Sequence, residues 1–176
     1  YRAICFGELE QMADVILVDT GAGIANHVLE FVLASPEVLV VTTPEPTSLT
    51  DSYSLLKSLY RNPKFNREYT KISVLSNRVT SAAEGRGVYD KLNTVVGQFL
   101  EGEITYAGMI PQDSALEKAI RMQKPVSLQA PLSKSARAFE VVAAELLQGE
   151  SSDAYRSFGL SRLFSGFWKQ KNEGVE

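Results

Sequence analysis

Apolar runs alternate with amphipathic stretches over most of this 176-residue chain. Four short strand candidates cover residues 14–19, 37–42, 71–76 and 104–110, and the first two are rich in β-branched residues and continuously apolar rather than alternating. Continuously apolar runs of this length are typical of strands in a parallel sheet whose two faces are both covered. We therefore predict four strands.

Apolar residues at helical spacing lie between these runs and after the last one. They predict helices over residues 26–34, 47–60, 82–99 and 133–147, although Gly85 and Gly87 make the first turn of the third helix doubtful. Strands that alternate with helices predict an α/β fold with a parallel sheet. We expect one domain over residues 1–148, a linker over 149–158 and a separate amphipathic helix over 159–172.

Composition excludes several classes of protein. With one cysteine and one histidine, the sequence supports neither a disulfide framework nor an ordinary Cys/His zinc site. The net charge of −3 does not fit a nucleic-acid-binding polycation. The charge is nevertheless uneven, because residues 156–172 carry +4 and leave −7 for the rest of the chain.

Polar or glycine-rich sequences follow each predicted strand. Ligands of open α/β sheets bind outside the carboxyl ends of the strands, so these sequences belong to one candidate site. After the 14–19 run, Asp19 is followed by Gly21 and Gly23. An aspartate in this place can hold Mg²⁺, and the glycines let a phosphate approach the backbone. A strand-to-helix turn with a capping aspartate explains the same residues equally well.

The other three strand ends carry Thr42-Thr-Pro-Glu-Pro46, Asn77-Arg-Val79 and Pro111-Gln-Asp-Ser114. Together with the aspartate motif, they resemble the MinD/ParA family of dimeric P-loop ATPases, and more narrowly the flagellar number regulators of the FlhG, FleN or YlxH type. The resemblance covers residues 14–148 and extends to the C-terminal tail. It implies a three-layer α/β fold with a parallel sheet of the P-loop NTPase type, whose N-terminal part is missing here.

For the phosphate end of a nucleotide site, the resemblance implies two residues and the cofactors ATP or ADP and Mg²⁺. Asp19 would be the Walker B aspartate that holds the metal ion, and Gly23 would be the switch glycine near the γ-phosphate. The sequence contains no Gly-x-x-x-x-Gly-Lys-[Ser/Thr] phosphate loop. We therefore assign no catalytic residue, and we expect this chain alone to bind ATP weakly and not to hydrolyse it. Because the chain opens on Tyr1, we interpret it as a fragment.

For the adenine end, the resemblance implies five residues. Asn77 would hydrogen-bond the edge of the base, since an amide offers a donor and an acceptor in one plane, and Arg78 would cover the base or the ribose. Pro111, Gln112 and Asp113 would form a loop that closes over adenine. Two plainer interpretations stay open: a polar turn at Asn77 and Arg78, and a helix N-cap at Asp113.

The C-terminal tail has one apolar helical face, which places its large side chains at Leu160, Leu163, Phe164, Phe167 and Trp168. Cations lie largely off that face. This composition is typical of a helix that lies in the interface of an anionic membrane, and it resembles the membrane-targeting helix of MinD-type proteins. A helix that packs on the core, or that binds a groove of a partner protein, is the alternative.

The resemblance implies an ATP-dependent switch that controls flagellar number or placement. Its ATP-bound homodimer would sit on the inner face of the cell membrane, peripherally and on the cytoplasmic side. Family partners would be the flagellar GTPase FlhF, or a basal-body or transcriptional partner. Two alternatives are a ParA-type DNA-partitioning ATPase, which the acidic body and the aromatic tail disfavour, and an interaction module without a P-loop.

Overall fold

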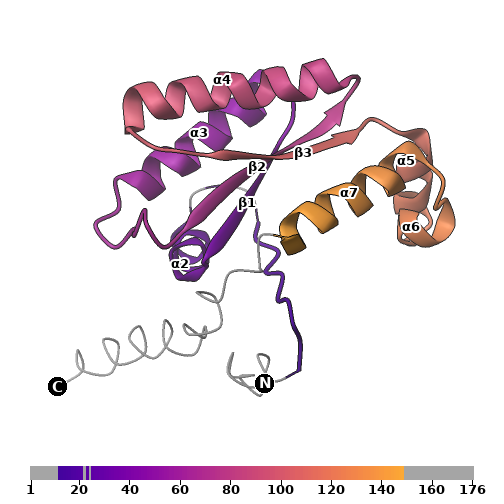
Figure 1. Cartoon of the computed structure of the whole chain (residues 1–176), viewed down its shortest axis with the longest axis horizontal. Helices are drawn as coiled ribbons and strands as arrows, with labels where there is room; N and C mark the ends of the chain where they lie inside the picture. The colour runs from indigo at the N-terminus through magenta and orange to yellow at the C-terminus, as the bar shows by residue number, and fades with distance from the viewer. Residues whose placement is uncertain (1–11, 22, 24, 149–176) are drawn as a thin grey trace.

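The computed structural model describes residues 12–21, 23 and 25–148. The predicted linker and amphipathic tail lie outside the described residues, and so do Leu160, Leu163, Phe164, Phe167 and Trp168. Helices and strands alternate in the order α2 Asn26–Ala34, β1 Glu37–Thr42, α3 Pro46–Tyr60, β2 Lys71–Val79, α4 Ala82–Leu100, β3 Thr105–Pro111, α5 Ser114–Arg121, α6 Val126–Gln129 and α7 Lys134–Gln148 (Figure 1).

The three strands form one parallel sheet in the order β1-β2-β3. Helices α3 and α4 connect neighbouring strands, as parallel pairing requires. The β1/β2 register is continuous from Glu37 opposite Lys71 to Thr42 opposite Ser76. The β2/β3 register shifts after Val74 and again after Asn77, so the carboxyl end of β2 is irregular.

Helices cover both faces of the sheet. Helices α3 and α4 lie on one face and α7 lies on the other (Figure 1). On the α3/α4 face, Val74 packs in a core with Leu56 and Val96. On the opposite face, Leu75 and its neighbours in β3 and α7 form a second buried cluster. Because successive strand residues point to opposite faces, an apolar run is what a sheet covered on both sides requires. The predicted three-layer α/β fold is confirmed.

Helix α4 begins at Ala82 despite the glycines in its first turns. The Ser81 hydroxyl accepts a hydrogen bond from the Glu84 N–H at 3.1 Å, and the Glu84 carboxylate accepts from the Thr80 N–H. The first bond satisfies an N–H group that the helix itself leaves unpaired, and the second ties the residue before the N-cap to the first turn. The expected weakness of this turn is therefore wrong. Gly85 serves close packing instead, because an added Cβ would lie 3.1 Å from the Cβ of Met109.

The predicted strand over residues 14–19 is wrong. Residues 15–20 form no helix or strand, and Leu17 is 87% exposed. Figure 1 shows this indigo segment leading away from the sheet. A strand is stable only where a neighbour pairs with its N–H and C=O groups and where other side chains cover its apolar ones. No strand in the described part of the chain pairs with this segment, so its apolar composition does not produce a strand.

Candidate functional site

A pocket of about 380 Å³ opens at the carboxyl ends of β2 and β3. Its volume is within the range of small-molecule sites, and its place is where open parallel sheets bind their ligands. The pocket is lined by Asn77, Arg78, Pro111, Gln112, Asp113, Leu116, Glu117, Ile120 and Arg121. The structure thus brings together all five residues that the sequence indicated for the adenine end.

Asn77 and Arg78 lie within the last three residues of β2 rather than in a loop after it. The register shift between Asn77 and Val79 leaves Arg78 without a partner in β3, and its φ of +58° is left-handed. The Asn77 Oδ1 accepts the Arg78 N–H at 2.9 Å and so stabilises this bulge. The interpretation as a polar turn is wrong, because the strand continues through both residues.

The Asn77 side chain keeps part of its hydrogen-bonding capacity. Its oxygen has a second lone pair, and no described residue accepts a hydrogen bond from its amide nitrogen. The side chain is half-buried and lines the pocket. One donor and one acceptor are therefore available there, which suits the edge of a heterocyclic base.

The loop after β3 is fixed to β2. The Gln112 N–H donates to the Val79 carbonyl at 2.8 Å, and Pro111 lies opposite Val79 in the sheet register. A proline at a strand end has no N–H to leave unpaired. The position of this loop is thus set by the backbone of the two strands that form the pocket.

Asp113 caps α5, as one of the two open interpretations proposed. Its Oδ1 accepts from the Ala115 N–H at 2.9 Å, while its Oδ2 accepts from the Ser135 N–H at 3.0 Å and the Ser135 hydroxyl at 2.9 Å. The hydrogen bond from the Ser135 N–H is the largest cause that lowers the pKa of this carboxyl, followed by the bond from the Ala115 N–H. The carboxylate is therefore ionised at neutral pH and engaged with protein donors.

Helix α5 adds four lining residues that the sequence interpretation missed, namely Leu116, Glu117, Ile120 and Arg121. They lie three, four, seven and eight positions after Asp113, so they form one face of the helix that Asp113 caps. The spacing of an N-cap followed by this face was a usable signal. These residues add two aliphatic side chains and one charge of each sign to the pocket.

A carboxylate of the β1–α3 connection lies within electrostatic reach of Arg78. The pKa of Glu45 is lowered first by a hydrogen bond from the Thr43 side chain, then by its own backbone N–H, and less by the charge of Arg78. Glu45 is exposed, so solvent screens this attraction. The arginine at the pocket nonetheless has an anionic neighbour from the adjacent strand end.

The two residues expected at the phosphate end do not line the pocket. Asp19 is exposed in the segment without regular structure, and Gly23 follows with a φ of +108°, which favours glycine. Among residues 12–21, 23 and 25–148, no group of three or more acidic, histidine or cysteine side chains could hold a metal ion. Mg²⁺ is often held by one carboxylate together with waters and phosphate oxygens, so Asp19 fits a single-ligand role only.

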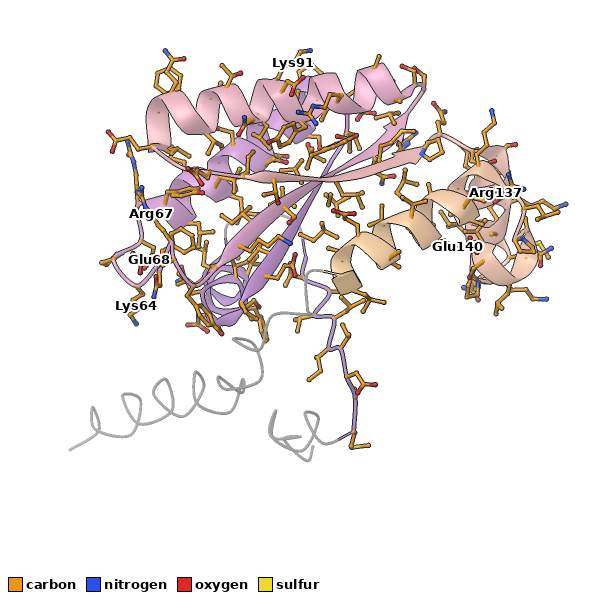
Figure 2. The ribbon with its side chains drawn as sticks, viewed as in Figure 1. Lys64, Arg67, Glu68, Lys91, Arg137 and Glu140 are labelled. Carbon is orange, nitrogen blue, oxygen red and sulfur yellow. The ribbon has the colours of Figure 1, made fainter. Side chains whose placement is uncertain are left out.

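A second cavity of about 310 Å³ lies between α3 and α4. Its lining is mostly apolar and consists of Leu49, Thr50, Tyr53, Lys91, Leu92, Val95 and Phe99. Lys91 lies on the outer side of α4, away from the sheet (Figure 2). This cavity has no arrangement of polar groups suited to chemistry.

No helix in the described part of the chain has the length and apolar character needed to span a membrane.

Sequence comparison finds relatives that are flagellar proteins. Over 141 residues the chain is 40% identical to the antiactivator FleN of Pseudomonas aeruginosa, a match that covers 80% of this chain and 49% of FleN. Over 135 residues it is 32% identical to the flagellum site-determining protein YlxH of Helicobacter pylori, covering 76% of this chain and 44% of YlxH. The chain thus spans about half the length of these relatives. No model of a protein family matches the chain.

Structure comparison finds cell-division ATPases. MinD of Pyrococcus furiosus has 25% identity and a TM-score of 0.59, with 80% of this chain and 54% of that one covered. MinD of Pyrococcus horikoshii, solved in complex with Mg-ADP, has a TM-score of 0.61 over 84% of this chain and 57% of its own. At 23% identity, the second likeness shows the fold alone.

Proposed function

We propose that this chain, a member of the MinD/ParA family of the flagellar number regulator type, forms the adenine-binding end of the nucleotide site of an ATPase switch. The observation that carries the proposal is the single pocket lined by Asn77, Arg78, Pro111, Gln112 and Asp113. The two strand ends that supply them are neighbours in a parallel sheet. Adjacent parallel strands bring such residues together by register alone.

The pocket offers what a purine base needs. The free donor and acceptor of Asn77 would meet the polar edge of adenine, and the aliphatic side chains of Leu116 and Ile120 would pack on its apolar face. The Arg78 guanidinium would lie over the base or against the ribose. The backbone of Pro111 and Gln112 would close the site at the end of β3.

The phosphate end remains less complete in this chain. Asp19 would hold Mg²⁺ through one carboxylate oxygen or a bound water, and Gly23 would let the backbone approach the γ-phosphate. The metal ion would supply charge neutralisation for the phosphates of ATP or ADP. Since the sequence has no phosphate loop with its lysine, we expect the chain alone to bind ATP weakly and not to hydrolyse it.

The wider function that we propose is control of flagellar number or placement by a nucleotide-dependent homodimer. The names of two relatives, an antiactivator and a flagellum site-determining protein, support this function. The apolar face and the cations of the tail would attach the dimer peripherally to anionic lipid at the inner, cytoplasmic face of the membrane. The FlhF GTPase, or a basal-body or transcriptional partner, would receive the signal.

Adenosine titration of the isotope-labelled chain, followed by NMR, tests the adenine pocket without depending on the phosphate end. We expect the backbone amides of Arg78 and Gln112 to shift with adenosine and not with guanosine, whose polar edge has the opposite arrangement of donor and acceptor. Asn77→Asp keeps the acceptor for the Arg78 N–H but removes the amide donor, so it should weaken binding about tenfold. The exposed Gln98→Ala in α4 is the control.

Equal shifts with both nucleosides would leave no base-specific site. Full affinity in Asn77→Asp would remove Asn77 from base recognition. Shifts confined to residues away from the carboxyl ends of β2 and β3 would place the nucleoside elsewhere and refute the proposal.

A further inference from the structure

The carboxylate of Asp113 joins the N-termini of two helices. One oxygen accepts the Ala115 N–H of α5, and the other accepts the N–H and the hydroxyl of Ser135 in α7, all at 2.9 to 3.0 Å. The first N–H groups of a helix have no partner within the helix, so each bond satisfies a donor that would otherwise need water. The positive ends of both helix dipoles also face the negative charge.

The three bonds leave this carboxylate little capacity for a ligand. An ionised carboxylate offers about four lone-pair positions, and three of them already accept a hydrogen bond. Bonds of N–H or O–H donors to an ionised oxygen are roughly twice as strong as neutral ones. A base that bound through Asp113 would have to compete with these donors.

The same carboxylate ends the loop that lines the pocket. On the other side of this loop, the Gln112 N–H is bonded to the Val79 carbonyl of β2. The loop is therefore held at one end by the sheet and at the other by the contact between α5 and α7. Ser135 has 0% of its surface exposed and does not line the pocket, so its hydrogen bonds connect it to the pocket through Asp113.

We propose that Asp113 is a positioning residue, whose carboxylate clamps α5 to α7 and thereby holds Pro111 and Gln112 in place for the base without hydrogen-bonding the base itself. This inference rests on the proposed function, since it takes the pocket to be the nucleoside site. It also separates Asp113 from Asn77, which would touch the ligand.

Three substitutions in the full chain distinguish a clamp from a direct contact. D113N keeps an acceptor for the Ala115 N–H, but an amide nitrogen, which cannot accept, then faces the Ser135 N–H. S135A removes the hydroxyl bond to Asp113 and a longer contact with the Ser133 hydroxyl, both outside the pocket, and keeps the Ser135 N–H. S133A is the control, because the Ser133 hydroxyl caps α7 through the Ala136 N–H at 3.2 Å and has no hydrogen bond to Asp113. The Ser133 hydroxyl also lies 3.4 Å from the Ser135 hydroxyl, but S133A leaves both bonds from Ser135 to Asp113 in place.

Adenosine affinity is measured by the same NMR titration. We expect D113N to weaken binding about tenfold and S135A about threefold, while S133A stays within about twofold of the unaltered chain. The double variant D113N/S135A should bind no more weakly than D113N, because both substitutions break the same contact between Asp113 and Ser135. If S135A keeps full affinity while D113N loses it, the carboxylate acts on the ligand directly and the proposal fails. If S133A loses as much as S135A, general loosening of α7 explains the loss and the proposal also fails.

Amide hydrogen exchange without nucleoside tests the clamp independently of binding. We expect the Gln112 N–H to exchange about tenfold faster in D113N and at an unchanged rate in S133A, because only the first frees the loop. An unchanged Gln112 rate in D113N would overturn the clamp. In contrast, an unaltered chain that shows no adenosine shift at Arg78 or Gln112 would refute the proposed function, so the two failures are distinguishable.

Discussion

Gly85→Ala should have two opposing effects on stability, a gain in helix propensity and a cost of overpacking, whose sizes can be compared. Alanine is favoured over glycine in a helix interior by about 0.8–1 kcal/mol. At this position, however, the new Cβ would lie 3.1 Å from both the Met109 Cβ and the Tyr106 hydroxyl oxygen. Overpacking of a close-packed interior costs about 1–3 kcal/mol. Because the second term is the larger, we expect Gly85→Ala to lower the free energy of unfolding by about 1 kcal/mol.

The same helix carries a matched control. A Cβ added at Gly97 would have nothing within 4 Å, and the residue is exposed, so Gly97→Ala should raise the free energy of unfolding by about 0.5–1 kcal/mol. The two variants should thus differ by about 2 kcal/mol in urea denaturation and by about 4–8 °C in Tm. Equal stabilisation by both substitutions would refute the close packing of α4 on β3 at Gly85.

Three further measurements address the caps and the tail. The pKa values of Asp113 and Glu84 are lowered by hydrogen bonds, so the stabilisation from these carboxylates is present above their ordinary pKa values. It should be lost as the pH falls below the ordinary values and through the lower folded ones, which acid titration followed by circular dichroism would show. Ser81→Ala should cost about 1 kcal/mol in urea unfolding, and no change would contradict the cap. Phe167→Ser/Trp168→Ser should abolish flotation with anionic vesicles; unchanged flotation would exclude these side chains as the anchor.

The sequence predicted most accurately the elements whose own pattern of apolar residues shows which face is buried. Helix α2 and strand β1 have the expected bounds, because a continuously apolar strand and an amphipathic helix both signal their buried faces. The start of helix α4 was predicted less well, since its two glycines have low helix propensity while the Ser81 side chain caps the first turn. This cap depends on hydrogen bonds between Thr80, Ser81 and Glu84, which residue propensities do not include.

The failure at residues 14–19 has a different origin. The run has the composition of a strand, but composition fixes which faces a strand would bury and not which neighbour would pair with it. Val15 and Leu17 are exposed in the structure, and no described strand supplies the missing hydrogen bonds. A strand forms only if a second segment pairs with it, so predicting one strand also assumes a partner strand.

The same distinction explains why the two ends of the candidate site differ. The residues expected at the adenine end come from β2 and β3, which pair as far as Val79 opposite Pro111 despite two register shifts, so local sequence and sheet pairing together bring them to one pocket. The phosphate end depends on Asp19, which lies in the unpaired segment and therefore has no position fixed by the sheet. We expect Asp19 to join this site when its segment pairs as a strand of the sheet. We therefore predict that nucleotide affinity at the phosphate end is limited by strand pairing, whereas affinity for the base depends on the loop that Asp113 and Gln112 hold.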